Sequence, residues 1–340
     1  MDKSTHVYDE KRISRMIIAS SIIIIGLILL SLGIGLSISL GAKDISLSTV
    51  ISSIFTGKDA VDSEIVRDVR LPRAIAAALV GAFLGVSGAI MQGVTKNPIA
   101  DPSIMGITQG ATLTVSVAFV MQAGIGNVGL MIFAFIGAMV SGLLVYFLST
   151  RSIKGVDPVK LVLAGTALGT LFISFAIAIA MYFNLSHQLS FWIAGGLTTA
   201  TWQGVQLLSI AGVFGVIAAI IISSNLTILS LGEEVAIGLG KKTNTIRMIG
   251  ILIVILLSGS SVAVAGNIAF VGLIVPQIAR SLVGPDYRYI IPCSLVIGAV
   301  LLVFSDIMAR MINQPYETPI GSLTALIGIP FFIYLVRKGG

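Results

Sequence analysis

The sequence has little charge: Asp, Glu, Lys and Arg make up 11% of its 340 residues, against 56% hydrophobic residues. Soluble domains are about a quarter charged, so this composition excludes an ordinary soluble protein. No charged residue occurs from Met16 to Leu40. A helix of that length reaches about 37 Å at about 1.5 Å per residue, which exceeds the ~30 Å hydrocarbon core of a bilayer. We therefore expect an integral membrane protein with many spans.

Cysteine and histidine are nearly absent. The single Cys293 allows no disulfide within the chain. His6 and His187 are isolated, so we expect no metal site and no cofactor. The nearest approach to a G-x-x-x-x-G-K-[ST] motif is "GLGKKT", with Val235 at the first glycine position and Lys242 at the Ser/Thr position. The chain is therefore not expected to bind ATP phosphates, and no nucleophile–base pair suggests an enzyme.

Apolar runs predict an all-α polytopic protein with about ten membrane-spanning helices in a single domain, residues 1–340. The first run follows Lys11, Arg12 and Arg15, so a cleaved signal peptide is the alternative. The run is longer than the apolar core of such a peptide and "SISLGAKD" is a poor cleavage site, so we favour an uncleaved span. The expected spans cover residues 16–40, 72–92, 103–121, 127–149, 159–183, 203–223, 246–265, 268–283, 290–309 and 320–336.

The basic residues indicate how these spans are oriented. Ten spans place both termini on one side, and fifteen of the 21 Lys and Arg residues then lie on that side. Because cytoplasmic loops carry the excess of Lys and Arg, we expect both termini in the cytoplasm of a bacterial cell. The short N-terminal segment 1–15 and the segment 225–245 would also face the cytoplasm.

Ionisable residues in or beside the spans are few. Asp306 lies four residues before Arg310, so the two share a helix face and can pair near the outer end of their span. This reading is preferred to a proton relay. Arg70 and Arg73 flank Pro72, which suits the first turn of a helix. Positive charge at a helix N-terminus opposes the macrodipole, so these outer-surface arginines either extend to lipid headgroups or bind an acidic partner.

Two prolines interrupt the chain between the second and third spans. Pro98 and Pro102 prevent a continuous helix, and Asn97 and Asp101 can accept backbone N–H bonds that start a helix. We expect a capped re-entrant turn, which leaves a role in gating open.

Both tryptophans of the chain lie in the outer loop between the fifth and sixth spans. Trp192 and Trp202 fit the belt of aromatic residues at a membrane–water interface. This interpretation is the stronger one for Trp202.

Adjacent carboxylates, Glu233 and Glu234, stand beside three glycines in "LGEEVAIGLG" (231–240). Carboxylates favour a helix N-terminus, and residues 226–245 are long enough for two short helices broken by glycines. Ala236 and Leu239 would give a small, partly apolar face suited to a groove of a soluble partner. The alternative is an ordinary solvated loop.

Several motifs together resemble the FecCD-type permeases, the membrane subunits of ATP-driven importers for ferric siderophores, haem and cobalamin. The resemblance covers nearly the whole chain in order. Gln277 stands where this family often has His, and Thr318 where it often has Leu. The matching stretches are "RLPRAIAAALVGAFLGVSGAIMQ" (70–92), "NPIADPSIMGITQGA" (97–111), "LVLAGTALG" (161–169), "FWIAGGL" (191–197), "LSLGEEVAIGLG" (229–240), "AGNIAFVGLIVPQIARSLVGPDYR" (265–288) and "ETPIGSLTALIGIPFFIYL" (317–335).

The resemblance implies a ten-helix permease that works as a pair, with two ATPase subunits inside and a substrate-binding protein outside. It implies an ATPase-coupling role for Glu233, Glu234, Ala236, Gly238, Leu239 and Gly240. It also implies binding-protein contacts at Arg70, Arg73 and Arg310, and a translocation pathway lined by Thr166, Thr170 and Ser174. The permease would carry out no bond chemistry.

The favoured cargo is a ferric siderophore, with the hydroxamate type preferred and cobalamin or haem as alternatives. An ion-coupled secondary carrier is a less favoured reading, because no carboxylate stands near the middle of a span. A membrane scaffold without transport activity is less favoured again. The sequence does not distinguish an identical partner permease from a second chain, nor a free binding protein from a lipid-anchored one.

Overall fold

The computed structural model describes residues 3–41, 45–46, 50, 53, 61–121, 125–150, 157–313 and 316–339, without the side chains of 3–12, 334–336 and 338–339. The elements in this part of the chain are all helical. The helices that correspond to the ten expected spans are α1 (Lys3–Ser39), α4 (Leu71–Thr95), α5 (Ile107–Met121), α6 (Asn127–Thr150), α7 (Pro158–Tyr182), α9 (Trp202–Ser230), α11 (Thr243–Ala265), α12 (Val271–Val283), α13 (Tyr287–Met311) and α14 (Ile320–Gly339). Short elements join them: α3 (Val61–Glu64), the π-helix η1 (Ile65–Arg70), the 3-10 helix η2 (Pro102–Met105), α8 (Ser186–Ala194) and α10 (Glu233–Gly238).

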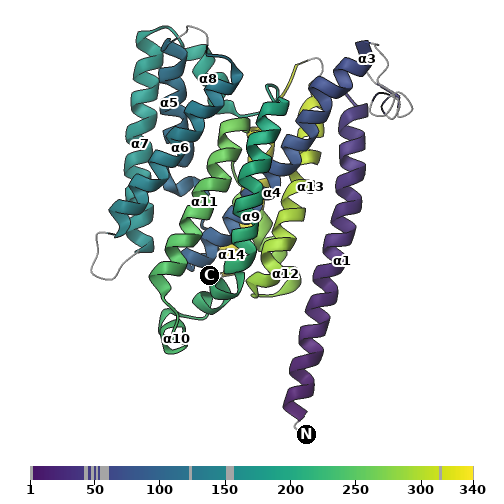
Figure 1. The fold of residues 1–340 in the computed structure, drawn as a ribbon, viewed down its shortest axis with the longest axis vertical. Coiled ribbons are helices and arrows are strands. Elements are labelled where there is room, and N and C mark those ends of the chain that lie inside the picture. Colours follow the sequence, from purple (N-terminus) through teal and green to yellow (C-terminus); the bar gives the residue numbers. More distant parts are fainter. Residues whose placement is uncertain are drawn as a thin grey trace.

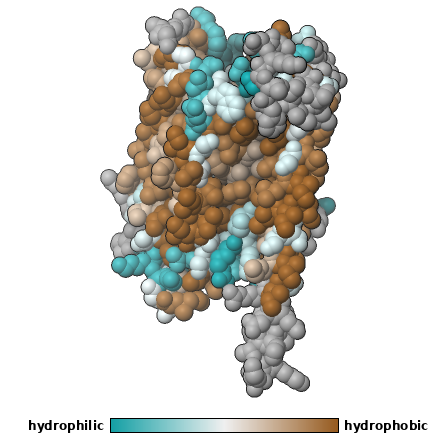
Figure 2. All heavy atoms as spheres, turned by 45° about the vertical axis from the view of Figure 1, so that its right-hand side comes forward, coloured by the Kyte–Doolittle hydropathy of each residue, from teal (hydrophilic) through white to brown (hydrophobic). Residues whose placement is uncertain are grey.

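The surface has the banding of a protein that crosses a membrane. Figure 2 shows a broad apolar belt on one face, with hydrophilic residues gathered above and below it. Within the described residues, seven helices are long and apolar enough to cross a bilayer, and α5, α12 and α14 contain shorter apolar stretches. The chain is a multi-pass membrane protein.

The helix α4 is the centre of the bundle. It packs along α13, α11, α9 and α12 (Figure 1). In the most apolar stretch of the continuous helix Val61–Thr95, 83% of the residues are buried. Glycine makes close contacts between these helices possible: a Cβ at Gly81 would overlap the carbonyl oxygen of Gly298. Hydrocarbon tails provide no hydrophobic drive between helices, so close backbone approach supplies the packing energy.

The helix α1 lies at the edge of the bundle, mainly against α13. The N-terminus and the C-terminus lie toward the same end as α10 (Figure 1). We call this the inner end and the opposite end the outer end. The expected N-terminal segment 1–15 is helical from Lys3 and continues into the span, since it contains neither proline nor glycine to stop the helix.

Two helical segments were not expected from the sequence. Residues before Pro72 form α3 and η1, so the second span begins at Val61 rather than residue 72. Pro72 cannot donate a backbone hydrogen bond, and a widened π turn precedes it. The outer loop contains α8, which ends at Gly195 with φ of 68°.

Candidate functional sites

The three arginines expected at the outer surface are buried instead. Arg70 and Arg73 are each 7% exposed, and the side chain of Arg310 is 9% exposed. Their guanidinium groups bind within the chain, and the predicted contacts with a binding protein stay a prediction. We call these three arginines with Asp306 and Glu317 the outer ion cluster.

Asp306 is the centre of the outer ion cluster. Its Oδ1 lies 2.9 Å from Arg73 Nη2, and its Oδ2 lies 3.2 Å from Arg310 Nη2. The predicted Asp306–Arg310 pair is therefore confirmed, and Arg73 joins it. Arg73 Nη1 also donates to Glu317 Oε1 at 2.7 Å. Buried charges are tolerated when they are paired in this way, so the cluster ties α4 and α13 to the segment before α14.

The other two arginines hold the outer end of α1. Arg70 Nη1 donates to the carbonyl oxygens of Ile38 and Ser39 at 2.7 and 2.9 Å. Arg310 Nη1 donates to that of Ser37 at 3.1 Å. The last carbonyls of a helix lack intrahelical partners, and a cation there also favours the macrodipole. The positive charge therefore caps a neighbouring helix rather than facing solvent.

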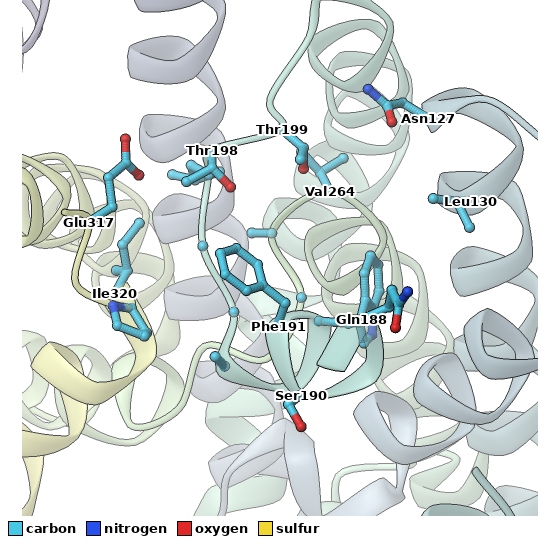
Figure 3. A pocket seen from close by; sticks show the side chains of 18 of the residues that line it. Asn127, Leu130, Gln188, Ser190, Phe191, Thr198, Thr199, Val264, Glu317 and Ile320 are labelled. Atoms are coloured by element: carbon cyan, nitrogen blue, oxygen red, sulfur yellow. The ribbon is translucent and has the colours of Figure 1, made fainter. Parts of the chain in front are cut away.

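Beside this cluster the structure has a pocket of about 470 Å³. We call it the outer pocket. It is enclosed by α8 with the loop that follows, the start of α14, and residues of α5 and α6. Figure 3 shows Glu317 and Ile320 on one side, Asn127 and Leu130 on the other, and Phe191 between them. Trp192 lines this pocket and is half-buried, so it does not lie free in the aromatic belt, whereas Trp202 is 39% exposed.

The segment with paired carboxylates forms one short helix, α10, rather than two. The preceding helix α9 runs on to Ser230 and leaves no room for a second. Gly232 and Gly240, with φ of 137° and 71°, make the turns on either side of α10, a conformation that favours glycine. Helix α10 protrudes from the inner end of the bundle (Figure 1).

The two adjacent glutamates have different surroundings. Glu233 Oε2 lies 3.0 Å from Nη2 of Arg247 on α11, whose side chain is 5% exposed. Glu234 is exposed and forms no ion pair in the described part of the chain. Ala236 is fully buried, while Leu239 is 59% exposed. Glu233 therefore attaches α10 to α11, whereas the carboxylate of Glu234 faces away from the described part of the chain.

The expected polar stripe lies on the exposed side of α7. Thr166, Thr170 and Ser174 are all exposed. Each hydroxyl donates to the carbonyl oxygen four residues earlier, at 3.0, 2.8 and 2.8 Å. The hydroxyls are therefore satisfied by the helix itself, and this face offers little polar attraction to a passing solute.

The turn expected between the second and third spans is present. Asn97 Oδ1 accepts from Ile99 N at 3.1 Å, and Asp101 Oδ1 accepts from Ser103 N at 2.9 Å at the start of η2. Pro102 occupies the first turn of η2. Gln277 Nε2 on α12 donates to the carbonyl oxygen of Pro98, a tertiary link that local patterns did not predict.

In the described part of the chain, no group of three or more His, Cys, Asp or Glu residues is placed to hold a metal ion. Cys293 is buried.

Comparison with known proteins decides the family. The model of the FecCD transport family matches residues 13–338. The chain belongs to the FecCD transport family. The iron(3+)-hydroxamate import system permease protein FhuB of Bacillus subtilis (strain 168) is 52% identical over 326 residues, 96% of this chain and 85% of that protein. The Fe(3+)-citrate import system permease protein YfmD of the same strain is 42% identical over 316 residues, 93% of this chain and 94% of that protein.

A solved structure shares this FecCD fold. It shows an ABC transporter of the metal-chelate type in an inward-facing conformation, with a TM-score of 0.82 and 30% identity. The match covers 94% of this chain and 99% of that chain. The FecCD resemblance and the all-α polytopic permease fold expected from the sequence are thus confirmed.

Proposed function

We propose that this FecCD-family chain is the membrane-spanning subunit of an ATP-binding-cassette importer that carries a ferric siderophore of the hydroxamate type. The 52% identity to the hydroxamate permease over 96% of the chain supports this cargo more than citrate, cobalamin or haem. The chain would lie in the cytoplasmic membrane of a bacterium with both termini in the cytoplasm. It would work with a second permease chain, two ATPase subunits and an outer binding protein.

The observation that carries the proposal is the form of α10. A six-residue helix at the inner end and the residue after it expose Val235, Ile237 and Leu239, with 46 to 59% of each accessible. Exposed apolar side chains on a protruding helix suit contact with a groove of a soluble partner. Glu233 joins α10 to α11 through Arg247, so movement of a bound ATPase would reach the spans.

ATP would be hydrolysed in the partner and not in this chain. The partner's preference for one of two permease conformations would supply the drive, since a ligand shifts an equilibrium only by its differential affinity. The stripe of Thr166, Thr170 and Ser174 on exposed α7 would line the passage between two permease chains. Hydroxyls already bonded to their own helix suit a passage that must not hold cargo tightly.

The outer binding protein would dock near the outer ion cluster. Arg73 and Arg310 are buried and paired, but Glu317 is 40% exposed. A carboxylate of the binding protein can therefore reach Arg73 only by replacing Glu317. Arg70, which holds α1, would support the docking surface from within.

The coupling proposal is tested with Glu234→Arg in cells that depend on this importer. We expect loss of ferric hydroxamate uptake and loss of ATPase co-purification, with normal protein level and membrane insertion. Glu64→Arg, the same reversal of an exposed carboxylate at the outer end, is the control and should keep ATPase co-purification. If uptake and co-purification both survive Glu234→Arg, α10 is not the ATPase dock.

The cargo is tested separately in proteoliposomes containing the whole importer. We expect ATP-dependent uptake of iron-labelled ferric trihydroxamate, unaffected by a protonophore. Competition by unlabelled ferric trihydroxamate, but not by ferric citrate, haem or cobalamin, would support the assignment. Uptake driven by an ion gradient without ATP would instead establish the secondary-carrier reading.

A further inference from the structure

The outer pocket is a built cavity to which the proposed coupling mechanism gives no role. Its volume of about 470 Å³ is within the range of about 300–1,000 Å³ of small-molecule sites. Its walls come from segments far apart in the sequence, including Asn127, Phe191 and Ile320 (Figure 3). It lies at the outer end of the bundle, where a cargo released by the binding protein would arrive.

The walls are mostly apolar, and they carry some hydrogen-bonding groups but little uncompensated charge. Asn127, Gln188, Thr198 and Thr199 contribute amides and hydroxyls, and Phe191, 68% exposed, contributes an aromatic face. Among the described lining residues, Glu317 and Arg73 pair at 2.7 Å, and His187 is the remaining titratable side chain.

An unused donor lies in the same wall. The indole N–H of Trp192 is buried and has no acceptor in the described part of the chain. A buried donor without a partner is uncommon because it costs free energy. A small shift of α8 that opened the pocket toward this group would allow a ligand oxygen to satisfy it.

We propose that the outer pocket binds the uncharged ferric trihydroxamate as its first contact with the permease, with selection against anionic iron chelates. Each hydroxamate carries one negative charge, so three of them neutralise Fe³⁺. The complex then presents iron-bound hydroxamate oxygens as hydrogen-bond acceptors, which match the N–H and O–H donors of the walls, and apolar carbon surface, which matches the rest. A citrate complex retains carboxylates, which would meet Glu317 and find Arg73 already paired. This inference rests on the proposed function, because it assigns a site to the proposed cargo.

Glycine at position 196 makes the pocket testable. Gly196 lines the pocket, and a Cβ built there has nothing within 4 Å. A leucine at this position would occupy the cavity without displacing the backbone. Its neighbour Gly195 is unsuitable, since its φ is 68° and a Cβ would overlap the carbonyl oxygen of Asn267. Gly35 on α1, outside the pocket, also has nothing within 4 Å of a built Cβ, so Gly35→Leu is the matched control.

The two tryptophans provide a direct binding signal. Trp202→Phe leaves Trp192, which lines the pocket, as the only tryptophan of the chain. With the full chain in lipid nanodiscs, we expect saturable quenching of this fluorescence by ferric trihydroxamate and none by ferric citrate. The converse variant, Trp192→Phe, keeps only Trp202, which does not line the pocket. Quenching of its fluorescence measures the non-specific effect of the iron complex.

Filling the pocket should weaken binding. In the Trp202→Phe background, Gly196→Leu should raise the dissociation constant at least about tenfold, and Gly35→Leu should leave it unchanged. Thr198→Val, which removes one hydroxyl and keeps the shape, should raise it about threefold to tenfold. This second variant keeps the test decisive if Gly196→Leu does not fold. Equal quenching in all variants, or no saturable quenching, overturns the proposal.

Uptake separates this inference from the proposed function. If the native importer transports ferric trihydroxamate and Gly196→Leu transports it equally well, the pocket is not on the route and the function stands. If the native importer transports no ferric trihydroxamate, the cargo assignment itself fails.

Discussion

Arg247 of α11 binds Glu233 of α10, with Nη2 and Oε2 separated by 3.0 Å. The hydroxyl of Thr243, at the start of α11, also donates to Glu233 at 3.4 Å. The first turn of the protruding helix is therefore attached to the next span. We infer that this attachment transmits movement, whereas Glu234 makes the contact outside the chain.

The first prediction distinguishes these two glutamates. Glu233→Gln removes the ion pair with Arg247, and a pair with one exposed partner is worth up to about 1 kcal/mol. We expect uptake to fall about fivefold while the ATPase still co-purifies. Glu234→Arg, by contrast, should lose co-purification. The anchoring role is contradicted if Glu233→Gln keeps full uptake.

The second prediction concerns the outer ion cluster. Asp306 is fully buried and pairs with both Arg73 and Arg310. Asp306→Asn would leave these guanidinium groups short of negative charge, so we expect a loss of about 3–5 kcal/mol in the free energy of unfolding. The measurement is denaturant unfolding in detergent micelles. Glu317→Gln is the matched comparison and should cost about 1 kcal/mol or less, because Glu317 is 40% exposed. Equal losses in the two variants would mean that Asp306 is not the centre of the cluster.

The third prediction is a pH dependence at the inner end. Asp286 precedes α13 and accepts from Arg288 Nη2 at 2.6 Å and from the Thr227 hydroxyl at 3.0 Å. Burial alone would raise the pKa of Asp286, but the hydrogen bonds from Arg288 and Thr227 lower it below its ordinary value. A depressed folded pKa stabilises the protein above the unfolded pKa, and this stabilisation is lost as pH falls through the folded pKa.

We therefore expect Asp286→Asn to lower the melting temperature at pH 7. The difference from the native protein should close as the pH is lowered below about 4. Thermal unfolding measured across this range checks the prediction. A difference that stays constant with pH would show that the side chain acts through its shape and not its charge.

The fourth prediction concerns the turn after α4. Gln277 Nε2 donates to Gln92 Oε1 at 2.9 Å and to the carbonyl oxygen of Pro98. Gln277→Leu removes both bonds and leaves the side-chain oxygen of the buried Gln92 without this donor, at a cost of about 1–3 kcal/mol. We expect faster trypsin cleavage after Lys96, which is exposed beside the turn, in inside-out vesicles. Gln277→His retains a ring N–H donor and should restore slow cleavage; failure of histidine to do so would indicate that Gln277 acts mainly by packing.

Local patterns were sufficient for the spans and for the turn at Asn97 to Pro102. In a bilayer core every backbone polar group must be bonded within the protein, and a helix achieves this within one segment, so an uncharged run such as 16–40 is read directly as a helix. Asn97 and Asp101 bond to backbone atoms two residues away, which is a local interaction. The family motifs along the chain were likewise sufficient to predict the permease fold.

The contacts of the arginines could not be read from the sequence. Arg73 meets Asp306 and Glu317 across separations of 233 and 244 residues, and no spacing rule connects them. The outer pocket is likewise a property of helix ends that meet only after packing. The apolar pattern by itself therefore determined which segments lie in the membrane. The folded bundle alone decided which charges are buried and paired, because burial depends on what the neighbouring helices bring to the same place.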